Sequence, residues 1–161
     1  MSLNKFYKGF LVLLAFGFGV NYWLKQTKNP GLPFSEIKLA DQTGKVFLGV
    51  MWKGKYVLVS YFQSWCGDCA RELPSIQKLQ DKVGSEKISI VLISDEPFLK
   101  INKFKNQFHS DLPFFQSVQP FKEIGVGVYP TTYLIGPDGK MILRRLEGYD
   151  WASPEVLQLI K

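Results

Sequence analysis

The stretch Ser60–Ile76, SYFQSWCGDCARELPSI, contains both cysteines of the 161-residue chain, Cys66 and Cys69. A run of β-branched and aromatic residues, Tyr56–Phe62, precedes the cysteines, and apolar residues with helical spacing follow them. Such a near-continuous apolar run is typical of a strand buried on both faces, as in parallel sheets. The sequence therefore predicts a strand, a short loop with two cysteines, and a helix.

The spacing of the cysteines argues against several structural uses. A disulfide between them would close a loop of a few residues, and the stabilisation that a disulfide provides grows with loop length. A structural zinc site needs four ligands, whereas the chain offers two cysteines and one distant histidine, His109. Covalent haem attachment needs a histidine after the second cysteine, where the chain has Ala70. Two unpaired thiols in a core are the remaining structural alternative.

The expected position of Cys66 at a helix N-terminus favours redox chemistry. Free backbone N–H groups and the helix dipole stabilise a thiolate at that position. Cys69 follows one helical turn later, where we expect it to be more shielded. Cys66 can then attack a substrate disulfide, and Cys69 can resolve the mixed disulfide. The spacing thus predicts a dithiol switch with Cys66 as nucleophile and Cys69 as resolving thiol.

The rest of the chain after residue 33 alternates between strand and helix patterns. The further expected strands are 34–39, 45–48, 88–94, 131–135 and 141–145, and the expected helices are 70–83, 97–108, 120–124 and 154–160. We expect Pro74 to kink the first of these helices and Ser153 to cap the last. Parallel strands joined by helices, followed by an antiparallel hairpin, predict an α/β fold with a mixed sheet covered on both faces.

The charge distribution argues against nucleic-acid binding, although the formal net charge is +6. The first 29 residues hold four lysines and no acidic residue. Without them, 16 basic and 14 acidic residues remain, a net charge of +2. The remaining domain therefore lacks the basic stripe that tracks phosphates, and we expect no nucleic-acid partner.

The N-terminal segment has the pattern of a membrane signal. Gly9–Leu24 is 16 residues long without a charge, which as a helix covers roughly 24 Å of the ~30 Å hydrocarbon core. Lys8 and Lys25 can snorkel to extend it, and aromatic residues flank it at interfacial positions. We expect a transmembrane signal anchor at 1–28, a linker at 29–33 and a globular domain at 34–161.

Two alternatives to the anchor are a buried helix of a soluble protein and a cleaved signal peptide. Three glycines and the terminal position argue against the first. Ala15-Phe16-Gly17 has small residues at cleavage spacing, but the apolar run before it is short. The short basic head favours a cytoplasmic N-terminus. The expected location is therefore the cytoplasmic (inner) membrane, single-pass, with the domain facing the periplasm or cell exterior.

Two motifs give the chain a family resemblance. Trp65-Cys66-Gly67-Asp68-Cys69 after a buried strand, with Tyr129-Pro130-Thr131 opening a later strand, resembles the thioredoxin superfamily. The match covers about residues 33–161 and is closer to the membrane-anchored TlpA/ResA-like thiol–disulfide oxidoreductases than to thioredoxin. The segments that carry this closer match are DQTGKVFL at 41–48, CARELP at 69–74 and YPTTYLIGPDGKMI at 129–142.

The resemblance implies a thioredoxin fold with an N-terminal β-hairpin extension and a cis peptide bond at Pro130, facing the cysteines. By the same resemblance, backbone groups near Pro130 dock an extended substrate segment. The residues expected to bind substrate are Trp65, Tyr129, Pro130 and Thr131. No cofactor and no metal are expected, because electrons come from another dithiol protein, either membrane-bound or exported.

The chain departs from its relatives beside the cysteines, so Gly67 and Asp68 are expected to tune the redox pair. Many relatives have a proline where this chain has Asp68, whose carboxylate opposes thiolate formation and favours a reductant. Loss of the proline's rigidity acts in the opposite direction, so the net change in the reduction potential of the pair is left open. Thioredoxin has an acidic residue where this chain has Ser60. Glu72 is then the candidate proton carrier near Cys69, and an exposed first-turn glutamate is the alternative.

The function that these features predict is reduction of disulfides in exported proteins. The cysteines of an apocytochrome c before haem attachment are one candidate substrate, by the resemblance. The alternative is a metallochaperone that carries copper(I) on the same two thiols.

Overall fold

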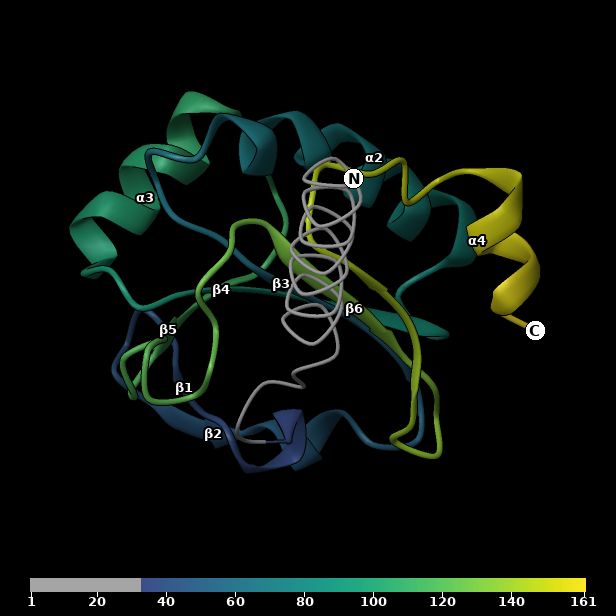
Figure 1. The fold of residues 1–161 in the computed structure, drawn as a ribbon, viewed down its shortest axis with the longest axis horizontal. Helices are drawn as coiled ribbons and strands as arrows, with labels where there is room; N and C mark the ends of the chain where they lie inside the picture. The colour runs from purple at the N-terminus through teal and green to yellow at the C-terminus, as the bar shows by residue number, and fades with distance from the viewer. Residues whose placement is uncertain (1–32) are drawn as a thin grey trace, which may run out of the picture. The chain divides into compact units, whose positions relative to one another are not determined.

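The computed structural model describes residues 33–161, in which seven strands form one sheet in the order β2-β1-β5-β4-β3-β6-β7 (Figure 1). The strands are β1 (Lys38–Ala40), β2 (Val46–Leu48), β3 (Tyr56–Tyr61), β4 (Ile88–Ser94), β5 (Phe114–Ser117), β6 (Thr131–Ile135) and β7 (Met141–Arg145). The helices are α2 (Gly67–Val83), α3 (Phe98–Gln107) and α4 (Pro154–Leu159), with short 3-10 helices η1 (Phe34–Glu36) and η2 (Gly49–Trp52).

The sheet is mixed, as the sequence predicted. The central strand β3 runs parallel to β4 and antiparallel to β6, and β4 runs parallel to β5. The β1–β2 hairpin attaches through an antiparallel pairing of β1 with β5, and β7 closes the other edge beside β6. The expected α/β thioredoxin-like fold with an N-terminal hairpin is therefore confirmed.

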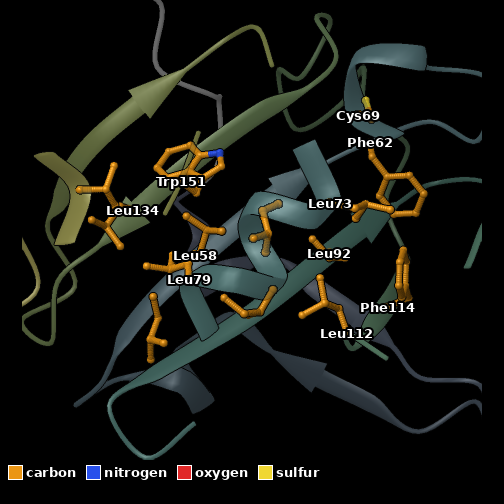
Figure 2. Close-up of a cluster of buried hydrophobic side chains, with 14 of the residues drawn as sticks. Leu58, Phe62, Cys69, Leu73, Leu79, Leu92, Leu112, Phe114, Leu134 and Trp151 are labelled. Carbon is orange, nitrogen blue, oxygen red and sulfur yellow. The ribbon is translucent and has the colours of Figure 1, made fainter. Parts of the chain in front are cut away.

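One face of the sheet carries the three α-helices of residues 33–161 (Figure 1). Apolar side chains at every third or fourth position of α2, including Leu73, Ile76 and Leu79, are buried there against the strands. Leu58 of β3 and Leu92 of β4 meet them from the sheet (Figure 2). Because α2 is held along its length by this core, its first turn is a rigid platform for the cysteines.

Within residues 33–161, the opposite face is covered without an α-helix. The segment 120–124, which the sequence predicted to be a short helix, forms successive turns instead. The amides of Glu123 and Ile124 donate to the carbonyl of Pro120, and the next turn closes where the amide of Val126 donates to the carbonyl of Phe121 at 2.9 Å. Gly125, with a positive φ of 77°, interrupts any helical continuation. Phe121, Ile124 and Val126 nevertheless bury their side chains on this face.

Several element boundaries differ from the expected ones. Phe34–Glu36 is a 3-10 helix, so the first strand begins only at Lys38. β5 was not predicted, because its four residues follow a proline and give too short a pattern. The helix α2 begins at Gly67, as expected from a helix start near Cys66, although its apolar spacing was recognised only from Ala70. It continues through the exposed Pro74. Ser153 caps α4 by accepting the amide of Val156, as predicted.

Within residues 33–161, no helix is long and apolar enough to cross a membrane. The expected signal anchor at residues 1–28 and nearly all of its linker lie outside the described residues, so the anchor stays a prediction.

Candidate active site

Cys66 and Cys69 are joined by a disulfide at the start of α2, with their Cα atoms 5.3 Å apart. Cys66 is the N-cap residue, and its sulfur accepts the backbone N–H of Cys69 at 3.1 Å. A sulfur at this position receives one of the free amides at the helix start and lies at the positive end of the helix dipole. Cys66 is 7% exposed and Cys69 3% exposed, in the order expected for nucleophile and resolving thiol.

The sheet brings the second motif to the same edge as the disulfide. β3 ends at Tyr61, which pairs with Thr131 at the start of β6. The loop that leads to Cys66 and the residues before Thr131 therefore leave the sheet side by side. The Tyr129–Pro130 peptide bond is cis, as the resemblance implied. The rings of Tyr129 and Trp65 meet edge to face, 5.8 Å apart, across the two loops.

The predicted substrate-binding residues differ in what they expose. Trp65 is 71% exposed and stands at the rim beside Cys66, whereas Pro130 is buried beneath that rim. The hydroxyl of Thr131 is buried and donates to the carbonyl of Val128 at 2.7 Å. Val128 is half exposed. The exposed rim therefore consists of Trp65, Val128 and part of Tyr129, while Thr131 holds the turn behind them.

The residues expected to tune the pair are both exposed. Gly67 and Asp68 form the first turn of α2 between the cysteines. The carboxylate of Asp68 is paired with the guanidinium of Arg71, one turn further along α2. This pairing partly offsets the negative charge of Asp68 next to the thiols, which weakens the effect expected from the sequence.

Glu72 is buried, with 2% of its surface exposed, and the alternative of an exposed first-turn glutamate is wrong. The indole N–H of Trp151 donates to one carboxyl oxygen. The hydroxyls of Thr132 and Ser60 donate to the other, at 3.1 Å and 3.4 Å. Helix α2, strands β3 and β6 and the segment before α4 thus converge on one carboxyl group, and Figure 2 shows Trp151 within this core.

Burial raises the pKa of the Glu72 carboxyl from its ordinary range to about 7. The hydrogen bonds from Trp151, Thr132 and Ser60 act in the opposite direction, because they stabilise the charged form. A carboxyl group with a pKa near 7 can both release and accept a proton at neutral pH. Since Cys69 lies one helical turn away on the same helix, Glu72 is placed to exchange protons with its thiol.

An open cavity of about 430 Å³ adjoins this carboxyl group. Its lining residues come from the first turns of α2 and from the segment 147–150, and they are Asp68, Arg71, Glu72, Ser75, Glu147, Gly148, Tyr149 and Asp150. The lining is polar and charged, so water can enter it. The cavity therefore connects the carboxyl group of Glu72 with solvent.

Sequence reasoning missed the residues that surround Glu72. Trp151 and Thr132 were not singled out, because nothing in their local pattern distinguishes them from core residues. Ser60 was noted only for lacking a carboxyl group, yet its hydroxyl contacts the carboxyl of Glu72. The acidic group that thioredoxin has at the position of Ser60 is here supplied from α2, and a pairing of Ser60 with Glu72 could have been suspected from that difference.

The fold and the cysteine pair together define a class: this is a thioredoxin-fold thiol–disulfide oxidoreductase, with the disulfide at a helix start and a cis-proline loop next to it. The chain belongs to the AhpC/TSA family, whose model matches residues 30–144.

Individual relatives agree with this assignment and confirm the TlpA/ResA-like resemblance. The thiol-disulfide oxidoreductase ResA of Geobacillus thermodenitrificans is 28% identical over 137 residues, which cover 81% of this chain and 79% of the relative. ResA of Bacillus anthracis is 27% identical, covering 92% and 96% respectively. The thioredoxin domain of a thiol-disulfide oxidoreductase from Bacteroides vulgatus has a TM-score of 0.71 at 21% identity, covering 84% of this chain and all of that one, which supports the fold.

Proposed function

We propose that this protein reduces disulfide bonds of exported proteins while tethered to the cytoplasmic membrane by its N-terminal segment. The observation that carries the proposal is the buried Glu72 carboxyl one turn from Cys69, at a disulfide placed on a helix N-terminus. A carboxyl of raised pKa supplies the proton transfers that disulfide exchange needs near neutral pH.

The reaction transfers two electrons from the dithiol to the substrate. The Cys66 thiolate attacks one sulfur of the substrate disulfide, forms a mixed disulfide and releases the other substrate sulfur as a thiolate, which takes up a proton. Cys69 loses its proton and attacks the Cys66 sulfur. This step forms the Cys66–Cys69 disulfide present in the structure and releases the second substrate thiol. A membrane-bound or exported dithiol protein then reduces the pair again.

Apocytochrome c with oxidised haem-binding cysteines is the first substrate to test, because the resemblance to TlpA/ResA-like proteins suggests it. Copper(I) transport on the same dithiol is the alternative function. Within residues 33–161 no group of three or more His, Cys, Asp or Glu side chains is placed to hold a metal ion, so no observation there favours it.

The direction of electron flow is tested by the reduction potential of the Cys66–Cys69 pair. The carboxylate of Asp68 disfavours thiolates, which stabilises the disulfide and favours a reductant, although its pairing with Arg71 moderates the effect. We expect a potential near the ~−270 mV of thioredoxin. Equilibration with glutathione or dithiothreitol buffers, followed by thiol alkylation, measures it. A value near ~−120 mV would identify an oxidant and overturn the proposed direction.

The membrane tether is tested by reporter fusions at the C-terminus, after Lys161. Because the apolar run Gly9–Leu24 follows a short basic head, we expect the domain on the outer face of the membrane. A reporter active only outside the cytoplasm should be active, and one active only in the cytoplasm should be silent. The same fusions without residues 1–28 serve as the control and should reverse the pattern. Cytoplasmic activity of the full-length fusion would contradict the exported location.

A further inference from the structure

Two adjacent carboxylates, Asp95 and Glu96, follow β4 at the edge of the sheet where the disulfide lies. Glu96 is buried, with 7% of its surface exposed. One of its oxygens accepts the backbone N–H of Ser64 at 2.5 Å, and the other accepts the Ser64 hydroxyl at 3.0 Å. Lys100 of α3 donates to Glu96 at 3.1 Å and balances its charge. Glu96 therefore anchors the loop before Cys66 to the body of the domain.

Asp95 joins two other segments. Its Oδ1 accepts the side-chain amide of Gln63 at 2.6 Å, and its Oδ2 accepts the backbone N–H of Phe121 at 2.8 Å. Gln63 belongs to the loop that leads to Cys66, and Phe121 belongs to the turns after β5. Hydrogen bonds to an ionised carboxylate are stronger than those between neutral groups. Asp95 thus ties the cysteine loop to the segment that precedes Pro130.

The connection closes into a ring at Tyr129. The Gln63 side chain acts on the Tyr129 hydroxyl by lowering its pKa, and the rings of Tyr129 and Phe121 lie 5.8 Å apart. Burial raises the pKa of Tyr129, the Gln63 side chain lowers it, and the charges of Asp95 and Glu96 raise it. The carboxylate of Asp95 therefore influences Tyr129 in two ways. Its bonds fix Gln63 and Phe121, which lie next to Tyr129, and its charge raises the pKa of the Tyr129 hydroxyl.

We propose that Asp95 is a positioning residue that holds the rim formed by Trp65 and Tyr129 in the geometry that docks an extended segment of the substrate protein. The bonds of Asp95 go to Gln63 and Phe121, which support Tyr129, and Tyr129 in turn packs edge to face against the exposed Trp65. Asp95 consequently acts on the binding of protein substrates and leaves the intrinsic reactivity of the thiols unchanged. This inference rests on the proposed dithiol exchange and names a residue that determines which disulfides that exchange reaches.

The test compares a protein-like and a small disulfide with the reduced full-length protein in detergent micelles. In wild type the two oxygens of Asp95 accept bonds from Gln63 and Phe121. Asp95→Asn keeps an acceptor oxygen for one of these donors but places an NH2 group, itself a donor, opposite the other. Loss of one charge-assisted bond corresponds to about a tenfold change in equilibrium. With an extended peptide that contains one disulfide, we expect KM to rise about tenfold while kcat changes less than twofold. With the disulfide of 2-mercaptoethanol, the rate should stay within twofold of wild type.

A double-mutant cycle separates this role from general loosening of the structure. Tyr129→Phe keeps the ring and removes the hydroxyl on which Gln63 acts. In that background Asp95→Asn should raise KM by no more than about threefold, because the link through Gln63 is already broken. Glu96→Gln is the matched control: it removes the neighbouring charge, and its effect should add to that of Tyr129→Phe. If Asp95→Asn fails to fold, Gln63→Met breaks the same link and replaces it in the cycle.

Three outcomes would overturn the inference. An equal loss of rate with the peptide and the small disulfide would show that Asp95 acts on the cysteine loop instead of the rim. Additive effects of Asp95→Asn and Tyr129→Phe on KM would show that the two residues are not connected. Unchanged KM for the peptide would show that the rim needs no support. By contrast, failure of wild-type protein to reduce either disulfide would refute the proposed function itself.

Discussion

Replacing Cys66 with serine should reduce disulfide exchange to the uncatalysed rate, whereas replacing Cys69 with serine should trap substrates as mixed disulfides. Cys66 is the N-cap of α2, where the amide of Cys69 bonds its sulfur and the helix dipole stabilises a thiolate. Without Cys66 no attacking thiolate remains at the helix start. Without Cys69 the first attack still occurs, but nothing resolves its product.

The order of attack can be measured directly. Non-reducing electrophoresis and mass spectrometry of the two variants, after mixing each with an oxidised substrate protein, report the trapped species. In reduced wild-type protein, a slow alkylating reagent should label Cys66 before Cys69, because Cys66 is the less buried of the two in the disulfide form. Faster labelling of Cys69, or mixed disulfides accumulating on the Cys66→Ser variant, would reverse the assigned roles.

Replacing Glu72 with glutamine should remove a large pH-dependent contribution to stability. The carboxyl group has an ordinary pKa of 4.5 in the unfolded chain and a pKa of about 7 when folded. Between these values the folded protein holds a proton that the unfolded chain has lost, so the free energy of unfolding falls as the pH rises. The difference corresponds to about 3 kcal/mol that is present below pH 4.5 and lost above pH 7.

The measurement is urea unfolding of the oxidised protein at about pH 5 and pH 8, values that bracket most of this titration. Between these two pH values, the free energy of unfolding of wild type should fall by most of the expected ~3 kcal/mol. This fall is in addition to any change that Glu72→Gln shows over the same range. Glu123→Gln, a substitution at an exposed glutamate, is the matched control and should behave as wild type. Parallel pH profiles of wild type and Glu72→Gln would contradict the raised pKa of Glu72.

The same carboxyl group should control the rate of exchange. Glu72→Gln keeps the size of the side chain and one acceptor oxygen but cannot titrate, so exchange should slow and lose an inflection near pH 7. Thr132→Val removes a hydrogen bond to the charged carboxyl, so the inflection should move to higher pH. Superimposable rate profiles for wild type and Glu72→Gln across roughly pH 5 to 9 would leave Glu72 as a structural residue only.

Much of the fold and the reactive centre could be predicted from local patterns. The buried strand before Cys66, the helix after it and the spacing of Cys66 and Cys69 are local properties, because a pattern of apolar residues decides each element. The same reasoning failed to identify elements that are too short to show a pattern. Four residues at β5 and five at 120–124 are too few for a period to distinguish a strand, a helix and successive turns.

The sequence by itself indicated the chemistry, because two cysteines one helical turn apart at an expected helix start form a pair of thiols suited to disulfide exchange. Tertiary structure decided how protons and substrates reach those thiols. The burial of Glu72 depends on Ser60, Thr132 and Trp151, which lie 12, 60 and 79 residues away along the chain. No local pattern can place such distant residues around one carboxyl group. Its pKa is therefore a property of the assembled core, because desolvation arises only when all the elements that exclude water are present.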